Sequence, residues 1–117
     1  MAIANVKIDT NDSSILLVPA GKKYAITTIL VCNTGVDDGT GANDTTFDLH
    51  VIPSGQSKGD GSNGGDNPNL ILNDLGVAAG DTFTFNVERL ILEEGDEVVF
   101  VGFPPTRLVA TISYLEV

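Results

Sequence analysis

The chain has 117 residues, a formal net charge of −10 and a single cysteine, Cys32. This length fits one domain, spanning residues 1–117, with a modest hydrophobic core. One cysteine excludes an intrachain disulfide and any zinc site built from two or more cysteines. The acidic balance argues against nucleic acid as a partner, because such binding relies on Lys and Arg that neutralise phosphates.

Hydropathy along the chain gives no sign of a membrane segment. No apolar run approaches the roughly 18 residues of a membrane helix, and the residues after Met1 lack the basic and long apolar regions of a secretory signal. We therefore expect no membrane partner and a protein made in a cytoplasm. Trp is absent and aromatic residues are few, so a stacking surface for sugars or single-stranded nucleic acid is poorly supplied.

Short runs rich in Val, Ile, Thr, Phe and Tyr are separated by Gly, Asp, Asn and Pro throughout the chain. No long segment keeps the i, i+3, i+4, i+7 spacing of an amphipathic helix, so the pattern predicts an all-β protein. About eight short strands are typical of a single antiparallel β-sandwich or jelly roll. The expected strands are Ala2 to Ile8, Ser14 to Val18, Lys23 to Asn33, Thr45 to Ile52, Leu70 to Leu72, Thr82 to Leu92, Glu97 to Gly102 and Arg107 to Glu116.

The hydrophobic pattern differs between these runs. Thr45 to Ile52 alternates apolar and polar residues, which predicts a half-buried strand with His50 on its solvated face. By contrast, Ile29 to Cys32 and Val98 to Val101 are apolar on both faces. For these two runs we expect either central strands or strands that another subunit covers.

A similar turn sequence recurs three times, in Val18 to Lys22, Val77 to Asp81 and Leu92 to Asp96. Each segment begins with an apolar residue, has Gly at its fourth position and precedes a new strand. Because Gly adopts a positive φ at little steric cost, we expect the same chain reversal at all three places.

Two segments break the strand pattern, residues 35–44 and 54–69, and we expect both to be long exposed loops rich in Gly, Asp and Asn. Their carboxylates are hard oxygen ligands of the kind that Ca²⁺ prefers, but neither segment has EF-hand spacing. Since Asp and Asn are also ordinary turn residues, we expect no metal, with calcium as the alternative. The calcium candidates are Asp37, Asp38, Asp44, Asp60 and Asp66.

Motifs for catalysis fail in their context. Gly55 to Gly59 matches the G-x-S-x-G elbow of α/β-hydrolases, but no helix pattern follows Ser57, and His50, the only histidine, precedes it. The acidic residues between Glu93 and Glu97 lie in a predicted turn, where carboxylates are usually solvated. We therefore predict no enzyme, no catalytic residue and no cofactor.

From Ser14 to Thr34 the chain contains an apolar strand, a Val-Pro-Ala-Gly-Lys turn and a strand that ends at Cys-Asn-Thr. This stretch, together with Ala79 to Phe83 and Ala110 to Glu116, resembles small structural proteins of tailed-phage virions, particularly those of cyanophages. The resemblance implies a β-sandwich that decorates capsids or builds tail parts, with no catalytic residues. Residues 54–69 look like an insertion relative to the shorter loops of that group.

The first functional expectation is a capsid decoration or cement protein that is assembled in the host cytoplasm, resides in the virion and binds the major shell protein. Association between copies on the particle is also expected. A tail, neck or fibre component is one alternative, and a carbohydrate-binding module for host surface sugars is another. The partner-contact candidates are the rigid corner of Phe103, Pro104 and Pro105, and Leu115 with Val117, which could extend an edge strand onto a neighbour.

Overall fold

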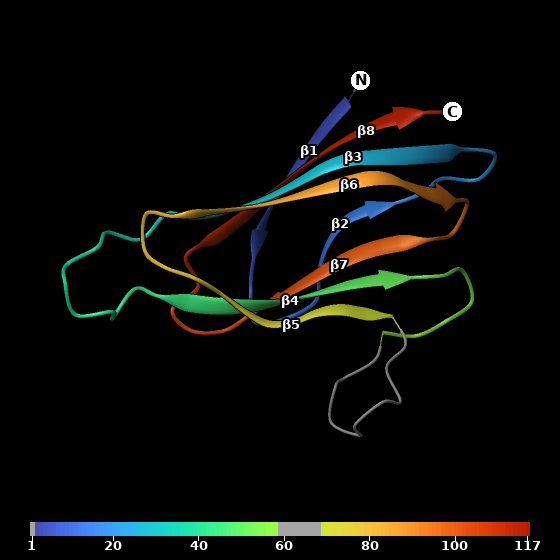
Figure 1. The fold of residues 1–117 in the computed structure, drawn as a ribbon. Coiled ribbons are helices and arrows are strands. Elements are labelled where there is room, and N and C mark those ends of the chain that lie inside the picture. Colours follow the sequence, from blue (N-terminus) through green and yellow to red (C-terminus); the bar gives the residue numbers. More distant parts are fainter. Residues whose placement is uncertain (1, 59–68) are drawn as a thin grey trace.

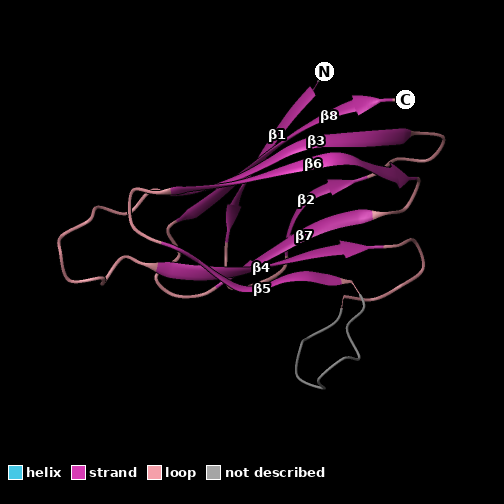
Figure 2. Ribbon diagram, in the orientation of Figure 1, coloured by secondary structure: helices cyan, strands magenta, loops and turns pink. Residues whose placement is uncertain are grey.

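A computed structural model describes residues 2–58 and 69–117 (Figure 1). These residues form eight strands and no helix, which confirms the all-β prediction (Figure 2). No helix able to cross a membrane therefore occurs in the described part. The strands are β1 (Ala2–Ile8), β2 (Ser13–Leu17), β3 (Lys23–Asn33), β4 (Thr45–Ile52), β5 (Leu70–Val77), β6 (Thr82–Glu93), β7 (Glu97–Gly102) and β8 (Leu108–Glu116).

The strands build two four-stranded antiparallel sheets, ordered β1-β8-β3-β6 and β2-β7-β4-β5. Pairing is nested, because β1 pairs with β8, β2 with β7, β3 with β6 and β4 with β5. The chain is thus one long hairpin rolled into two layers, which is the jelly-roll arrangement. Figure 1 shows the two layers, with both termini at the same end as the β2–β3 and β6–β7 turns.

The core lies between the two sheets and is filled by the inward-facing residues of every strand. Phe47 is fully buried and packs against Phe100 and Phe83, with ring centroids 5.9 and 6.0 Å apart. The two runs that are apolar on both faces lie in β3 and β7, which are interior strands of their sheets. This position confirms the central-strand alternative for both runs.

The three recurring turns have the predicted backbone. Gly21, Gly80 and Gly95 have φ values of 75°, 82° and 84°. In each turn, the residue after Gly donates its N–H to the carbonyl two residues before Gly, at 2.9–3.1 Å. This pattern is that of a type II turn with Gly at its third position. Residues 53–56 form a fourth turn of the same kind around Gly55, whose φ is 84°.

The largest error in the strand prediction concerns β5, which continues five residues beyond the expected end at Leu72. Asn73, Asp74 and Gly76 are residue types common in turns, but the register with β4 shifts twice, between Phe47 and His50. Asp74 takes a positive φ of 51° and donates its N–H to Asp48 Oδ1 at 2.8 Å. β-Bulges thus keep these residues in an edge strand.

Candidate functional site

The outer face of the β2-β7-β4-β5 sheet is covered in part by its own chain. His50 lies on that face but is only 1% exposed, so the prediction of a solvated histidine was wrong. Its ring Nδ1 lies 3.1 Å from Oδ1 of Asn69, which is itself buried, and Asn69 Nδ2 donates to the Ser57 carbonyl at 2.9 Å. Lys58 pairs with Asp12, at the far edge of the sheet beside β2. The segment after β4 therefore folds back across this face.

The outer face of the β1-β8-β3-β6 sheet has no such cover among the described residues. Its outward side chains alternate with core residues along each strand, and most are small, hydroxylated or aliphatic. We call it the neutral face, formed by Ile3, Asn5, Ala25, Thr27, Thr28, Leu30, Cys32, Thr82, Thr84, Asn86, Ile91, Val109, Thr111, Ser113, Leu115 and Val117.

Charge on the neutral face is confined to its two ends among the residues whose side chains are described. Lys7 lies at one end, and Lys23 faces Glu93 at the other. In a chain with sixteen acidic residues, a sheet face whose described central side chains include no carboxylate is unusual. Five of the nine exposed large hydrophobic side chains in the described part also gather here: Ile3, Leu30, Ile91, Leu115 and Val117.

Two pairs of polar side chains on the neutral face are bonded to each other. The Thr27 and Ser113 hydroxyl oxygens lie 2.7 Å apart, and Asn5 Nδ2 donates to Thr111 Oγ1 at 2.6 Å. Buried polar groups cost little free energy when they keep hydrogen-bond partners. These pairs therefore lower the cost of removing the face from water.

A shallow apolar groove of about 490 Å³ lies at the C-terminal end of the neutral face. It is lined by Ala25, Thr27, Ile91, Leu115 and Val117. Val117 is 63% exposed although its N–H donates to the Lys23 carbonyl at 2.9 Å. The groove thus combines fixed backbone with accessible aliphatic side chains, a combination typical of the centre of a protein interface.

Two ion pairs lie beside this groove. Lys22 Nζ is 2.9 Å from Glu116 Oε1, and Lys23 Nζ is 3.4 Å from Glu93 Oε1. The hydrogen bond to Glu116, and then the charge of that carboxylate, raise the pKa of Lys22. All four side chains are largely exposed, so they supply a polar rim and contribute little to stability.

The structure separates the two groups of predicted contact residues. Leu115 and Val117 lie in the groove, whereas Phe103, Pro104 and Pro105 follow β7 at the opposite end of the sandwich. The nine residues of β8 between them span roughly 30 Å at about 3.3 Å per residue. Phe103 is 37% exposed, and its carbonyl accepts the Thr45 hydroxyl at 2.7 Å.

The edge-strand route predicted for Leu115 and Val117 is closed along β8 from Leu108 to Tyr114. β8 pairs with both β1 and β3, so it is an interior strand of its sheet. The open edges of that sheet belong to β1 and β6. Contact through the Leu115 side chain would therefore use the face of the sheet.

The carboxylates of the calcium candidates in the first loop accept hydrogen bonds that fix the conformation of the loop. Asp37 accepts the Gly39 N–H at 3.0 Å, and Asp44 accepts the Ala79 N–H at 2.9 Å. Asp38 accepts both the N–H and the hydroxyl of Thr40. Across the described part of the chain, no group of three or more His, Cys, Asp or Glu side chains is arranged to hold a metal ion. The candidates Asp60 and Asp66 lie outside the described residues.

The hydrolase-like motif does not form an elbow over the residues described. Ser57 is exposed in the segment after β4, and its carbonyl is bonded to Asn69. The His50 ring is buried against Asn69 on β4. Between Glu93 and Glu97, the carboxylate of Asp96 accepts backbone N–H groups from Ser54 and Glu93 at 2.8 and 2.9 Å. The Asp96 carboxylate therefore links the turn at residues 93–96 to the turn at residues 53–56.

Comparison of the chain with protein-family models, curated proteins and solved structures finds no match in any of the three. The candidate site consequently rests on geometry and composition alone. The sequence did not predict that the residues of the neutral face form one continuous surface. Its one indication was the run from Ile29 to Cys32, which is apolar on both sides. Which sheet face stays uncovered depends on residues 53–58, because they lie over the outer face of the other sheet.

Proposed function

We propose that this protein is a non-enzymatic structural component of a tailed-phage virion, a capsid decoration or cement protein that binds the major shell protein through its neutral face. The observation that carries the proposal is a sheet face that no described segment covers and whose described central side chains are uncharged, on a chain of net charge −10. Interface cores are depleted in charged residues and ringed by polar ones, as this face is.

The resemblance to virion proteins involves the same part of the molecule. Ser14 to Thr34 covers β2, its turn and β3, and Ala110 to Glu116 covers most of β8. β3 and β8 are the two middle strands of the neutral face. The residues that carry the resemblance thus build the surface to which we assign binding.

The size of the face suits a modest interface. Four strands spaced about 4.8 Å apart and about 25 Å long present roughly 500 Å² in projection. Accessible area exceeds projected area, so the face approaches the ~800 Å² that each partner contributes to a standard interface. Carboxylates elsewhere on the molecule keep neighbouring copies apart and disfavour other docking orientations.

The test is cosedimentation with capsids assembled without this protein. Leu30, at the centre of β3, is 36% exposed, and Leu30→Glu places a charge in the middle of the neutral face. Ile71→Glu is the matched control, because Ile71 is 44% exposed on β5 of the other sheet. We expect saturable binding of the unmodified protein, a loss of at least tenfold with Leu30→Glu, and unchanged binding with Ile71→Glu.

Circular dichroism of each variant separates lost binding from lost folding. Failure of the unmodified protein to bind capsids, or equal binding by a folded Leu30→Glu variant, would overturn the proposal. Binding to isolated tails in place of capsids would reject the decoration role and support the tail alternative.

A further inference from the structure

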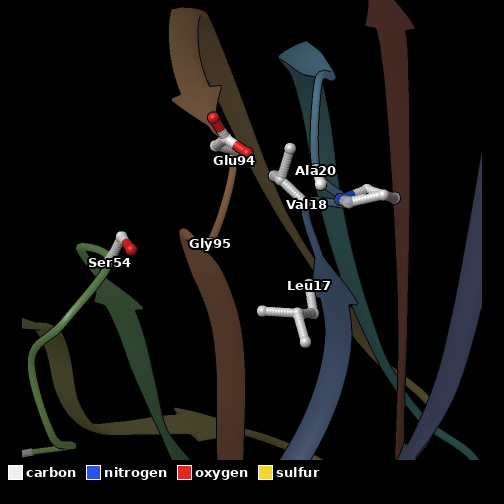
Figure 3. Close-up of a pocket in the computed structure, with 7 residues that line it drawn as sticks. Leu17, Val18, Ala20, Ser54, Glu94 and Gly95 are labelled. Atoms are coloured by element: carbon white, nitrogen blue, oxygen red, sulfur yellow. The ribbon is translucent and has the colours of Figure 1, made fainter.

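A second hollow lies at the end of the sandwich that carries both termini, away from the neutral face. Three Gly turns, at residues 19–22, 53–56 and 93–96, surround an open depression of about 710 Å³. Figure 3 shows Leu17 and Ser54 on opposite sides of this hollow, with Glu94 above and Gly95 between them. We call it the end groove; Pro19 and Ala20 complete its apolar wall.

The walls of the end groove are tied together by hydrogen bonds. Asp96 accepts the Ser54 N–H through Oδ1 and the Glu93 N–H through Oδ2, at 2.8 and 2.9 Å. Val18 also exchanges backbone bonds with this turn, donating to the Asp96 carbonyl at 3.0 Å and accepting the Gly95 N–H at 2.9 Å. Because the groove is already formed, a ligand would lose little free energy in ordering it.

The lining combines aliphatic surface with one available carboxylate. Leu17 is 59% exposed toward solvent. Lys22 and Lys23, the cations adjoining these turns, are paired with Glu116 and Glu93. Within the described residues, Glu94 therefore has no ion-pair partner, and it accepts a long hydrogen bond from the Gly21 N–H, at 3.3 Å.

We infer that the end groove binds a short basic segment of another protein, in which an aliphatic residue adjoins Lys or Arg. The aliphatic side chain would pack against Leu17, Pro19 and Ala20, and the cationic head group would pair with Glu94. Lys and Arg suit this surface because their alkyl stems cover apolar atoms while the charge reaches a carboxylate. The net charge of −10 would also attract a basic segment and speed the encounter.

The probe is the acetylated, amidated peptide Gly-Leu-Arg-Leu-Arg-Gly, titrated into the ¹⁵N-labelled full chain at low salt. We expect saturable amide shifts confined to Val18, Gly21, Ser54 and Gly95. Glu94→Gln should weaken binding at least threefold. Asp81→Asn is the control, because it removes an exposed carboxylate in the β5–β6 turn at the opposite end of the sandwich, and it should change affinity less than twofold.

Two further peptides test the chemistry of recognition. Gly-Leu-Glu-Leu-Glu-Gly should not bind, since it reverses the charge, and Gly-Ser-Arg-Ser-Arg-Gly should bind at least threefold more weakly, since it lacks aliphatic contacts. Shifts spread over the whole acidic surface, or equal affinity with Glu94→Gln, would overturn the inference. Shifts of the same amides with protein concentration alone would assign the groove to a second copy. Capsid binding through the neutral face is measured separately, so either proposal can fail alone.

Discussion

Asn69 holds the buried ring of His50, with 3.1 Å between Asn69 Oδ1 and His50 Nδ1. The contact joins the residue before β5 to the outward face of β4, and the Asn69 amide also donates to the Ser57 carbonyl. Backbone bonding supports the same position, since the Val51 N–H donates to the Asn69 carbonyl at 2.9 Å. Asn69 thus fastens the returning chain to the sheet that it covers.

Asn69→Ala should lower the free energy of unfolding by about 1–3 kcal/mol, because it leaves the buried His50 ring nitrogen without this partner. Urea unfolding followed by circular dichroism measures the change. Asn73→Ala, at an exposed position on β5, is the control and should have an effect within about 0.5 kcal/mol. Equal stability of the two variants would mean that the Asn69 side chain does not hold this face.

Gly95 combines a positive φ of 84° with a close approach to Ser54. A Cβ added at Gly95 would lie 2.8 Å from Ser54 Cβ, whereas one added at Gly21 would meet nothing within 4 Å. Gly21→Ala should therefore cost about 1 kcal/mol through the backbone alone, and Gly95→Ala about 2–3 kcal/mol through backbone and contact together. Thermal and urea unfolding of both variants check the difference.

Ser54→Gly provides the internal control for Gly95. Combined with Gly95→Ala, it should recover about 1 kcal/mol by removing the contact, which leaves only the backbone cost. The same Ser54 change combined with Gly21→Ala should recover nothing. Additive effects at positions 54 and 95 would contradict the steric explanation.

Asp38 is held by Thr40, whose hydroxyl donates to Asp38 Oδ1 at 2.6 Å and whose N–H donates at 2.9 Å. The hydroxyl bond, and then the backbone bond, lower the pKa of Asp38 below its ordinary range. Since the folded-state pKa lies below the unfolded one, any stabilisation is present above pH ~4 and is lost as pH falls through the lowered pKa.

Thr40→Ala should raise the Asp38 pKa toward its ordinary range, because the largest cause of the shift is removed. A side-chain carboxyl NMR titration measures it directly. Thr10→Ala, in the β1–β2 connection, should leave the Asp38 titration unchanged. An identical Asp38 titration in the Thr40→Ala variant would show that the hydroxyl bond does not form in solution.

Strand positions could be predicted from the sequence wherever inward and outward residues alternate or both faces are apolar. β5 could not, because Asn73 and Asp74 have turn-forming side chains and their place in a strand depends on Asp48 across the sheet. Local propensity contains no information about that partner. The glycine turns were predictable, since the need for a positive φ is a local property.

The candidate site could be predicted only in fragments. Leu115 and Val117 were predicted as contact residues, but their neighbour Ile91 comes from β6, and its proximity depends on strand order. His50 was expected in solvent because alternation indicates the face of a strand, not whether a distant segment covers that face. The proximity of Ile91 and the burial of His50 both depend on contacts between residues far apart in the sequence.

Asn33 ends β3 and is 1% exposed, with every polar group of its amide in use. Its Nδ2 donates to the carbonyls of Asn43 and Val77 at 2.8 and 2.9 Å, and its Oδ1 accepts the Gly35 N–H at 2.8 Å. A Cβ added at Gly35 would approach Asn43 Cβ to 2.8 Å, so the loop is tightly packed here. One side chain therefore anchors the first long loop to β5.

Asn33→Ala should lower the free energy of unfolding by about 2–4 kcal/mol, because one buried and two part-buried hydrogen bonds to backbone groups are lost. In the Asn33→Ala variant, backbone amides of the 35–44 loop should exchange with solvent faster than those of the strands. Asn33→Asp keeps the acceptor for Gly35 but directs a carboxylate at two carbonyls, so its deficit should shrink as pH falls from 7 toward 4 and the group becomes a donor. A deficit independent of pH would show that the amide does not bridge Asn43 and Val77.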